Sequence, residues 1–448
     1  MKHTGIFTGL TLLSALFFLA SCINTDHTLG SAFVSDSQDI SVHTVTLDLP
    51  LGESRPVADL QSRMSNSVTV GSLGTAISSE GLMSVNAATD SIIWGRNPSV
   101  HRVYLSFSRD TTLILQDDQR YIPQNLYVHQ LTFELDSTHA NGSLDIFKGE
   151  YYTATPVSDG GCVYTGDDIY IVDLKKSVGE RLLQIPMEIL DSAELFMKQF
   201  YGFCLRTEQP DSHTDENAGR LTVFDLSGSS LYLVWDYDDE NGNRLRSTAS
   251  FQLGQYYSLN LYRNGGTPAD NGGDILVRGL SGNKPRIEAA SLRKTVTDWA
   301  AAAGIALENL VVAKATVEFP FEYDGDLHQF DHYAGNLFPC RRTLNDGLPY
   351  YTPIEEINDS DLENGSIDRS LLRYKSNISL YLQDILQRDA GGLTDEDDLW
   401  MMPTTAYYNS YTGATYYYAD NVYYSQTVLN GTAAERHPVL KLTYSVLK

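Results

Sequence analysis

The sequence predicts a mainly β protein made of two jelly-roll-like β-sandwich modules, each with a short covering helix. Short apolar or alternating runs, rich in β-branched and aromatic residues, recur along the 448 residues. Gly, Asn, Asp and Pro separate these runs, and few stretches have helical spacing. One order of strand, helix and closing strand also recurs in both halves, which indicates two related modules.

The N-terminus has the pattern of a bacterial lipoprotein signal. Lys2 precedes an apolar run over 6–20 that is too short to span a bilayer, and Leu19-Ala20-Ser21 leads into Cys22. We therefore expect a signal peptide over 1–21, acylation (including palmitate) of Cys22, and a polar tether over 22–40. The alternative is an ordinary secretory signal in which the cysteine is a coincidence.

The predicted first module covers residues 41–264. Its expected strands are 42–49, 103–107, 113–115, 126–128, 131–135 and 144–146. The runs 231–237 and 244–253 flank Asn241-Gly242, and an Asn-Gly pair at this place favours a type I′ hairpin. The Asp- and Glu-rich stretch 236–242 resembles a calcium loop, but its register puts Tyr237 at the first ligand position, so we interpret it as the hairpin tip.

Three segments have the apolar spacing of helices that pack on a sheet: 189–200, 292–303 and 377–386. Asp191 and Glu194 resemble a capping box for the first, Gly304 ends the second, and Asn377 opens the third before Gly391.

The proposed repeat aligns 126–135 with 310–319. It continues with helices near 191–201 and 377–389, and ends with closing strands at 230–236 and 439–446. The Gly-rich stretch 265–274 reads as a linker, which leaves 275–448 as the second module.

Charge and cysteine content limit the partners and the redox chemistry. A formal charge of −25 excludes a surface that follows nucleic-acid phosphates. With Cys22 acylated, Cys162, Cys204 and Cys340 remain. Buried free thiols are the expected state, and a Cys162–Cys204 bridge is the alternative. No zinc spacing is present.

Several motifs together resemble a family of Bacteroidota lipoproteins known as the domain of unknown function forty-two seventy. They are the signal, Leu29-Gly30, the turn over 276–282, Pro285-Arg286-Ile287 and the final segment 436–444. The resemblance implies attachment to the outer membrane and no catalytic residue. Residues 23–27 lack the dense acidic run that is often associated with surface export. The protein could therefore lie on either the periplasmic or the cell-surface side of the outer membrane. The strand pattern is also similar to that of carbohydrate-binding jelly rolls.

The sequence has no standard enzyme signature, and we expect no cofactor. Its best metal-like cluster is Asp324, Asp326, His328 and His332, but Asp-Gly-Asp favours a turn, so we expect no bound metal.

Tyrosine is abundant near the C-terminus, where eight rings fall within a short segment: Tyr407, Tyr408, Tyr411, Tyr416, Tyr417, Tyr418, Tyr423 and Tyr424. Half-buried strands and a recognition surface both explain them. Adjacent strand residues point to opposite faces, so some rings must be exposed.

These observations predict a lipid-anchored envelope protein that is a non-enzymatic binding or accessory module. Its expected partners are the membrane, through the lipid, and a glycan or an envelope protein. A pilus or adhesin subunit that donates a strand is the alternative. A carbohydrate-active hydrolase would require a concave pocket with converging carboxylates.

Overall fold

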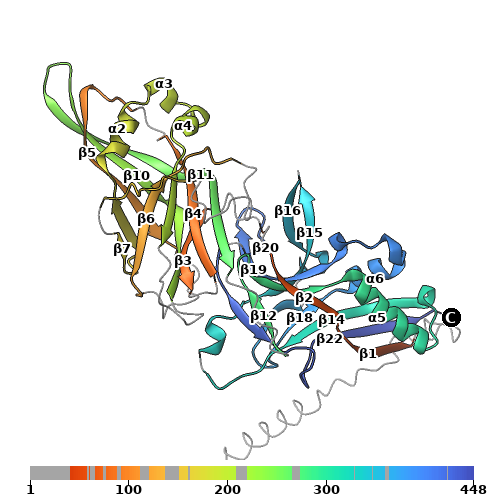
Figure 1. The fold of residues 1–448 in the computed structure, drawn as a ribbon. Coiled ribbons are helices and arrows are strands. Elements are labelled where there is room, and N and C mark those ends of the chain that lie inside the picture. The colour runs from red at the N-terminus through yellow and green to blue at the C-terminus, as the bar shows by residue number, and fades with distance from the viewer. Residues whose placement is uncertain are drawn as a thin grey trace, which may run out of the picture.

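The computed structural model describes fourteen stretches of the chain (Figure 1): 41–57, 60, 66–73, 77–87, 92–110, 121–136, 151–159, 162–207, 219–264, 273–326, 328–345, 347–358, 363–420 and 422–447. The predicted signal, Cys22, Leu29-Gly30, the tether, the strands 113–115 and 144–146 and most of the linker lie outside these residues. Within them, no helix is both long and apolar enough to cross a bilayer.

The N-terminal lobe is built on one antiparallel sheet, in the order β7-β6-β9-β4-β11-β10-β5-β8, with β3 beside β4 and β10. Its strands are β3 (Ser67–Leu73), β4 (Ile77–Asn86), β5 (Arg96–Arg109), β6 (Gln124–Gln130), β7 (Val163–Tyr164), β8 (Ile169–Asp173), β9 (Phe203–Thr207), β10 (Gly219–Asp238) and β11 (Arg244–Asn264). Short helices cover one end of the lobe: α2 (Lys176–Leu183), α3 (Met187–Leu190) and α4 (Ala193–Gln199).

The C-terminal lobe packs two antiparallel sheets around one core, in the orders β1-β22-β14-β18-β17 and β16-β15-β19-β13-β2. Its strands are β1 (Val42–Asp48), β2 (Leu51–Pro56), β12 (Ile275–Arg278), β13 (Asn283–Ile287), β14 (Leu310–Pro320), β15 (Leu337–Asn345), β16 (Leu348–Pro353), β17 (Asn364–Asp368), β18 (Arg373–Asn377), β19 (Leu399–Asn409), β20 (Ala414–Ala419), β21 (Gln426–Leu429) and β22 (Val439–Val446). The helices are α5 (Ala289–Ala302) and α6 (Ser379–Gln387), with short 3₁₀ turns at Leu307–Asn309, Gln329–Asp331, Glu355–Asn358, Ala390–Gly392 and Asp395–Asp397. The prediction of a mainly β protein with few short helices is confirmed.

The first two strands correct the predicted domain boundary. We expected residues 41–57 in the first module, but β1 pairs with β22 and β2 pairs with β13, both in the C-terminal lobe. Leu49, Val57 and Leu60 are buried in the core of that lobe. Local spacing predicts a strand but not its partner, because strand pairing joins segments far apart in sequence.

The two lobes do repeat one unit, although not with the predicted first strand. β6 lies between β7 and β9, away from the closing strand, whereas β5 lies between β10 and β8, just as β14 lies between β22 and β18. Phe107 pairs with Tyr170 in one lobe, and Phe319 pairs with Tyr374 in the other. The predicted correspondence of 230–236 with 439–446 fits this alignment.

A shared irregularity supports the alignment of β5 with β14. The pairing of β10 with β5 shifts between Val234 and Trp235, and the pairing of β14 with β22 shifts between Val312 and Lys314, at the same distance from the Phe pairs. Bulges re-aim strands and are retained as designed features, so the same bulge in both lobes indicates a common plan.

The covering helix of the N-terminal unit is α2, which the sequence analysis missed. The amide of Leu174, just before α2, donates to the carbonyl of Val103, and Ile378, just before α6, donates in the same way to Ala315. Gly179 interrupts the helical pattern of α2. A Cβ there would approach Leu233 and Val100 to 2.9 Å, so close packing of the helix on the sheet requires glycine.

The predicted helices are found with adjusted ends. The first stripe is split into α3 and α4, and the side chain of Ser192, not Asp191, caps α4 by accepting from Leu195 N at 3.4 Å. α5 ends as expected, with Gly304 at φ 72°. In α6, Leu380 is 63% exposed and does not belong to the buried face.

Two smaller predictions are confirmed. The predicted hairpin joins β10 to β11, but its turn is not type I′, because Gly242 has a φ of 83° whereas the φ of Asn241 is not positive. The carboxylate of Asp239 accepts from the amides of Asn241 and Asn243 at 2.8 Å. Cys162, Cys204 and Cys340 are free and buried.

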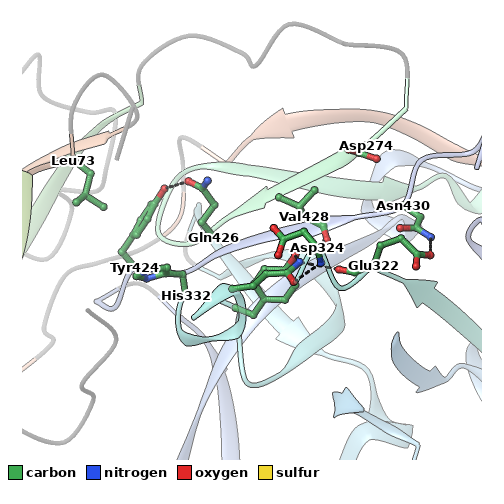
Figure 2. A pocket seen from close by; sticks show the side chains of 11 residues that line it. Leu73, Asp274, Glu322, Asp324, His332, Tyr424, Gln426, Val428 and Asn430 are labelled. Carbon is green, nitrogen blue, oxygen red and sulfur yellow. Dashed lines mark hydrogen bonds between the residues drawn. The ribbon is translucent and has the colours of Figure 1, made fainter. Parts of the chain in front are cut away.

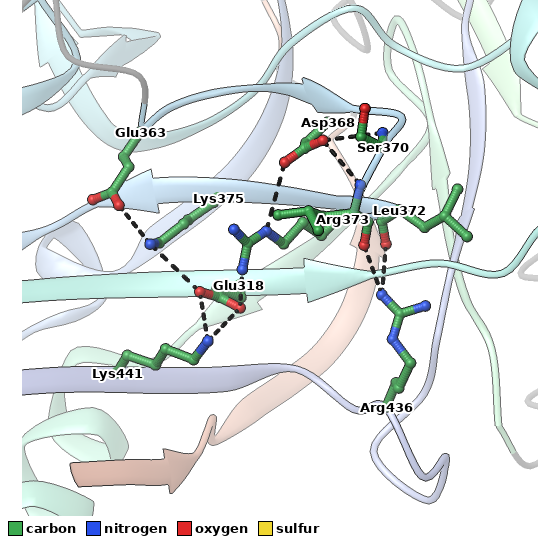
Figure 3. Close-up of polar contacts among 10 residues, drawn as sticks. Glu318, Glu363, Asp368, Ser370, Leu372, Arg373, Lys375, Arg436 and Lys441 are labelled. Carbon is green, nitrogen blue, oxygen red and sulfur yellow. Dashed lines mark hydrogen bonds and ion pairs between the residues drawn. The ribbon is translucent and has the colours of Figure 1, made fainter. Parts of the chain in front are cut away.

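An ion-pair network covers the outer face of β14, β18 and β22 (Figure 3). Glu318, with 8% of its side chain exposed, accepts from Arg373 at 2.8 Å and Lys441 at 3.0 Å, and lies 3.6 Å from Lys375. Burial alone would raise the pKa of Glu318, but the hydrogen bond from Lys441 and the three positive charges lower it overall. Glu363 pairs with Lys375 and Lys314 at the edge of this network.

Replacing Glu318 by Gln should destabilise the protein by about 3 kcal/mol at pH 7, because three partly buried cations lose their common partner. The pKa of this carboxyl is lower in the folded chain than its ordinary 4.5, so its contribution is complete at neutral pH and is lost as the pH falls through the folded value. Urea unfolding at pH 7 and pH 3.5 should therefore show a larger difference between the two proteins at pH 7. Asp298→Asn, which breaks an exposed pair with Lys294, is the control and should change stability by about 0.5 kcal/mol or less. An equally small effect of Glu318→Gln would contradict the account.

Candidate functional site

A cavity of about 490 Å³ opens where the two lobes meet (Figure 2). It is lined by Leu73, Asp274, Glu322, Asp324, Gln329, His332, Tyr333, Tyr424, Gln426, Val428 and Asn430. Leu73 comes from β3 of the N-terminal lobe, and the other residues belong to the C-terminal lobe. Three carboxylates, three amides, an imidazole and two phenols line this cavity together with Leu73 and Val428, so its wall combines polar groups with apolar surface.

Two segments hold most of the lining in place. The chain leaves β14 at Pro320 and carries Glu322 and Asp324 around the mouth. Gln329 fixes this loop, since its amide nitrogen donates to the Glu322 carbonyl at 2.8 Å and its oxygen accepts from the Asp324 amide at 3.1 Å. On the opposite wall, β21 and its flanks present residues 424–430.

The two walls are tied together by hydrogen bonds. Tyr333 Oη donates to the Val428 carbonyl at 3.1 Å, and burial raises the pKa of Tyr333, which keeps the phenol protonated. Asn430 Nδ2 donates to Glu322 Oε1 at 2.9 Å. Much of the wall is therefore preorganised before any ligand enters.

Three polar groups retain atoms that the protein does not use. None of the described residues hydrogen-bonds to the Asp274 carboxylate, and Asp324 accepts through Oδ1 alone, from the amide of Asp326 at 2.8 Å. The buried His332 Nδ1 lacks a hydrogen-bond partner among the described residues. The two carboxylates offer hydrogen bonds to a bound molecule, whereas His332 Nδ1 is shielded from solvent.

The four residues of the metal-like cluster do not lie together in the structure. Asp324 and His332 line the cavity, whereas His328 turns aside and its Nδ1 lies 2.8 Å from Asp331 Oδ2. Asp326 accepts from the His328 amide at 2.9 Å, so the segment is a chain of side-chain-to-backbone turns, as Asp-Gly-Asp predicts. Across the described stretches, no group of three or more His, Cys, Asp or Glu side chains is arranged to hold a metal ion.

The tyrosines of the segment 407–424 also lie in different environments. Tyr424 is 6% exposed and donates to Gln426 Oε1 at 2.9 Å inside the cavity, and Tyr423 Oη donates to Asp110 Oδ2 of the other lobe at 2.6 Å. Tyr417 packs against Phe338, with ring centroids 4.8 Å apart. The exposed rings belong to the β19–β20 hairpin: Tyr408, Tyr411, Tyr416 and Tyr418. The side chain of Tyr407 is outside what the structure describes.

The turn between β12 and β13 packs against residues that line the cavity. Leu280 has a φ of 54° and packs with Leu73, Tyr262 and Tyr424, so it joins the lobes beside the cavity. The fully buried ammonium of Lys284 donates to the carbonyls of Leu280 and Gly282 at 2.9 Å and to that of Arg278.

The charge state of this lysine follows from its surroundings. Burial lowers the pKa of Lys284 to about 7, and the carboxylate of Asp420 opposes this shift. The three carbonyl oxygens match the three donors of an ammonium group, so this one side chain holds the turn closed.

The tyrosines on the two faces of β20 should respond differently to substitution. Tyr417→Ser should lower the melting temperature by several degrees, because it removes a partly buried ring that packs on Phe338 and contributes about 1–2 kcal/mol. Tyr416→Ser and Tyr418→Ser, 41% and 58% exposed in the parent, should each change it by about 1 °C or less. Calorimetric scans of the three variants test this, and equal shifts would show that the faces are assigned wrongly.

Sequence reasoning selected Asp324, His332 and Tyr424 but missed Asp274, Glu322 and Asn430, which converge only after the chain folds. Neither a family model nor a curated protein matches this chain, so its function has to be argued from these residues.

Proposed function

We propose that the protein is a lipid-anchored, non-enzymatic binding module of the bacterial outer membrane, and that it binds a glycan in the cavity between its lobes. The lipoprotein signal and the resemblance to Bacteroidota lipoproteins support the location. The cavity supports the binding role.

The observation that carries the proposal is the pair of uncommitted carboxylate groups on Asp274 and Asp324 in one preorganised cavity. Carboxylates accept hydrogen bonds from sugar hydroxyls, and charge-assisted bonds of this kind are stronger than neutral ones. The Tyr424 ring offers an apolar face beside them, which suits the C–H face of a pyranose.

The volume and the charge of the cavity limit the class of ligand that it can bind. A volume of about 490 Å³ lies within the usual range of small-ligand sites, about 300–1,000 Å³, and suits one or two sugar rings. Three carboxylates at the wall disfavour sulfated or uronic sugars, because like charges repel. We therefore propose a neutral or amino sugar.

An array of neutral, amino and acidic oligosaccharides should show retention of neutral or amino sugars alone. In titration calorimetry with the best ligand, Asp274→Asn should weaken binding about tenfold, the effect of losing roughly 1.5 kcal/mol from a charged acceptor. Glu194→Gln, on the exposed surface of α4, is the matched control and should bind as the parent does. Unchanged affinity for Asp274→Asn, or retention of acidic sugars only, would contradict the proposal.

A glycoside hydrolase is the second candidate function, because the cavity carries several carboxylates. Glu322 and Asp324 line one cavity, and a hydrolase needs two carboxylates on either side of the bond. Release of reducing ends from the bound oligosaccharide, abolished in Asp324→Asn, would replace the binding role by catalysis.

The lipid anchor is tested separately. Cys22→Ser should move the protein from the membrane fraction to the soluble fraction, because the acyl chains supply the attachment. Cell fractionation followed by mass spectrometry of the N-terminal peptide measures both. A parent chain that is soluble, or whose Cys22 is unmodified, would remove the anchor from the proposal.

A further inference from the structure

Four exposed tyrosine rings gather on the hairpin formed by β19 and β20 (Figure 1). They are the rings of Tyr408, Tyr411, Tyr416 and Tyr418, and Tyr411 at the tip is 99% exposed. None of the described residues makes a hydrogen bond or a ring contact with the side chains of these four tyrosines. Grouped apolar surface that the fold leaves in water is typical of an interaction site.

Strand geometry sets the direction of two of these rings. Tyr416 and Tyr418 lie on either side of Tyr417 in β20, so they share the face opposite to Tyr417, which packs on Phe338. Two residues of a strand span roughly 7 Å, so the two rings follow one another along β20 at about that distance. Tyr416 and Tyr418 therefore form a short aromatic row on the outer face of the hairpin.

The turn at the tip of the hairpin is held by its own hydrogen bonds. Asn409 Oδ1 accepts from the amide of Tyr411 at 2.9 Å, and the Asn409 carbonyl accepts from the amide of Gly413 at 2.8 Å. Gly413 has a φ of 68°, which glycine adopts without strain. The backbone that carries the rings is thus ordered before a partner binds, which lowers the entropy cost of binding.

The hairpin carries no charged side chain. Of the whole chain 20% is charged, but residues 399–419 contain no Asp, Glu, Lys or Arg. The two flanking carboxylates are used inside the protein, since Asp398 accepts from Arg286 Nε at 2.6 Å. Asp420 likewise accepts from the Thr405 hydroxyl at 2.9 Å. The surface around the rings is therefore neutral in a protein whose net charge is strongly negative.

Charge and area together favour one class of partner. An ionic ligand finds no opposite charge on this hairpin, and the net charge of −25 repels anionic polymers. The four rings expose on the order of 500 Å², less than the roughly 800 Å² that each partner commonly buries in a stable protein complex. The C–H face of an uncharged sugar ring needs no counter-charge and only the area of one aromatic ring.

We propose that the β19–β20 hairpin is a polysaccharide-binding surface, on which an extended neutral polysaccharide lies along β20 with its sugar rings stacked on Tyr416 and Tyr418. Neither ring lines the cavity between the lobes, so this surface is a separate site. The inference does not depend on what the cavity binds or on how the protein is attached to the cell.

Native electrophoresis of the whole protein through gels that contain a soluble polysaccharide tests this surface. A protein with a charge of −25 migrates fast, and binding to a neutral polymer slows it. The neutral probes are hydroxyethylcellulose, arabinoxylan, laminarin and glycogen, and carboxymethylcellulose is the charged counterpart of the first. We expect at least one neutral polymer to slow the protein and carboxymethylcellulose to leave its mobility unchanged.

Variants of the aromatic row locate the binding. The double variant Tyr416→Ser/Tyr418→Ser should bind the retarding polymer at least about tenfold more weakly, because it loses two stacking contacts. Tyr418→Ser alone should lose about threefold, which keeps the test decisive if the double variant is destabilised. Tyr416→Phe/Tyr418→Phe retains both rings and should bind as the parent does. The dependence of mobility on polymer concentration gives each dissociation constant.

Two further variants separate this surface from other sites. Tyr256→Ser removes a similarly exposed ring from β11, and Asp274→Asn alters the cavity, so both should bind the polymer as the parent does. Equal weakening by Asp274→Asn would assign the polymer to the cavity instead of the hairpin. The proposal is overturned if no neutral polymer slows the parent, or if retardation survives the loss of both rings. Tyrosine-dependent capture of a protein, without binding of any polysaccharide, would assign the surface to a protein partner and overturn it as well.

Discussion

The antiparallel pairing of β1 with β22 is the constraint on which the C-terminal lobe depends. It brings the first described strand against the last, places Leu49 in the core, and leads β2 across to the second sheet. The two sheets therefore share residues 41–57, and the lobe combines the first and the last strands that the structure describes. Because all the described strands of the N-terminal lobe lie between β2 and β12 in sequence, the lobes are linked by topology as well as by their interface.

The comparison of the lobes shows what local sequence predicts and what it does not. The Asn241-Gly242 hairpin and α5 follow from local rules of turn geometry and helical spacing. The helix α2 was missed because Gly179, which the packing against Leu233 requires, weakens its pattern. The repeat was proposed from the alignment of 126–135 with 310–319, but this alignment chose β6 in place of β5, since amphipathic strands look alike until their neighbours are known.

The cavity shows a second limit. Asp324 and His332 were selected as possible metal ligands, yet they face a space that also contains Asp274 and Asn430 from remote parts of the chain. The residue types identified Asp324 and His332 as side chains that could bind a ligand. Which ligand they could bind depends on the other groups that the fold brings beside them. The eight tyrosines divide for the same reason, because Tyr423 and Tyr424 join the lobes while Tyr416 and Tyr418 remain on the hairpin surface.

The buried amino group of Lys284 has a consequence for what holds the joint between the lobes together. Three carbonyls converging on a point are the kind of ligand set that many extracellular proteins fill with calcium. Here the chain places the amino group of its own Lys284 among the carbonyls, so the turn that supports the joint between the lobes requires no ion from the medium. Removal of divalent cations by a chelator should leave that joint intact.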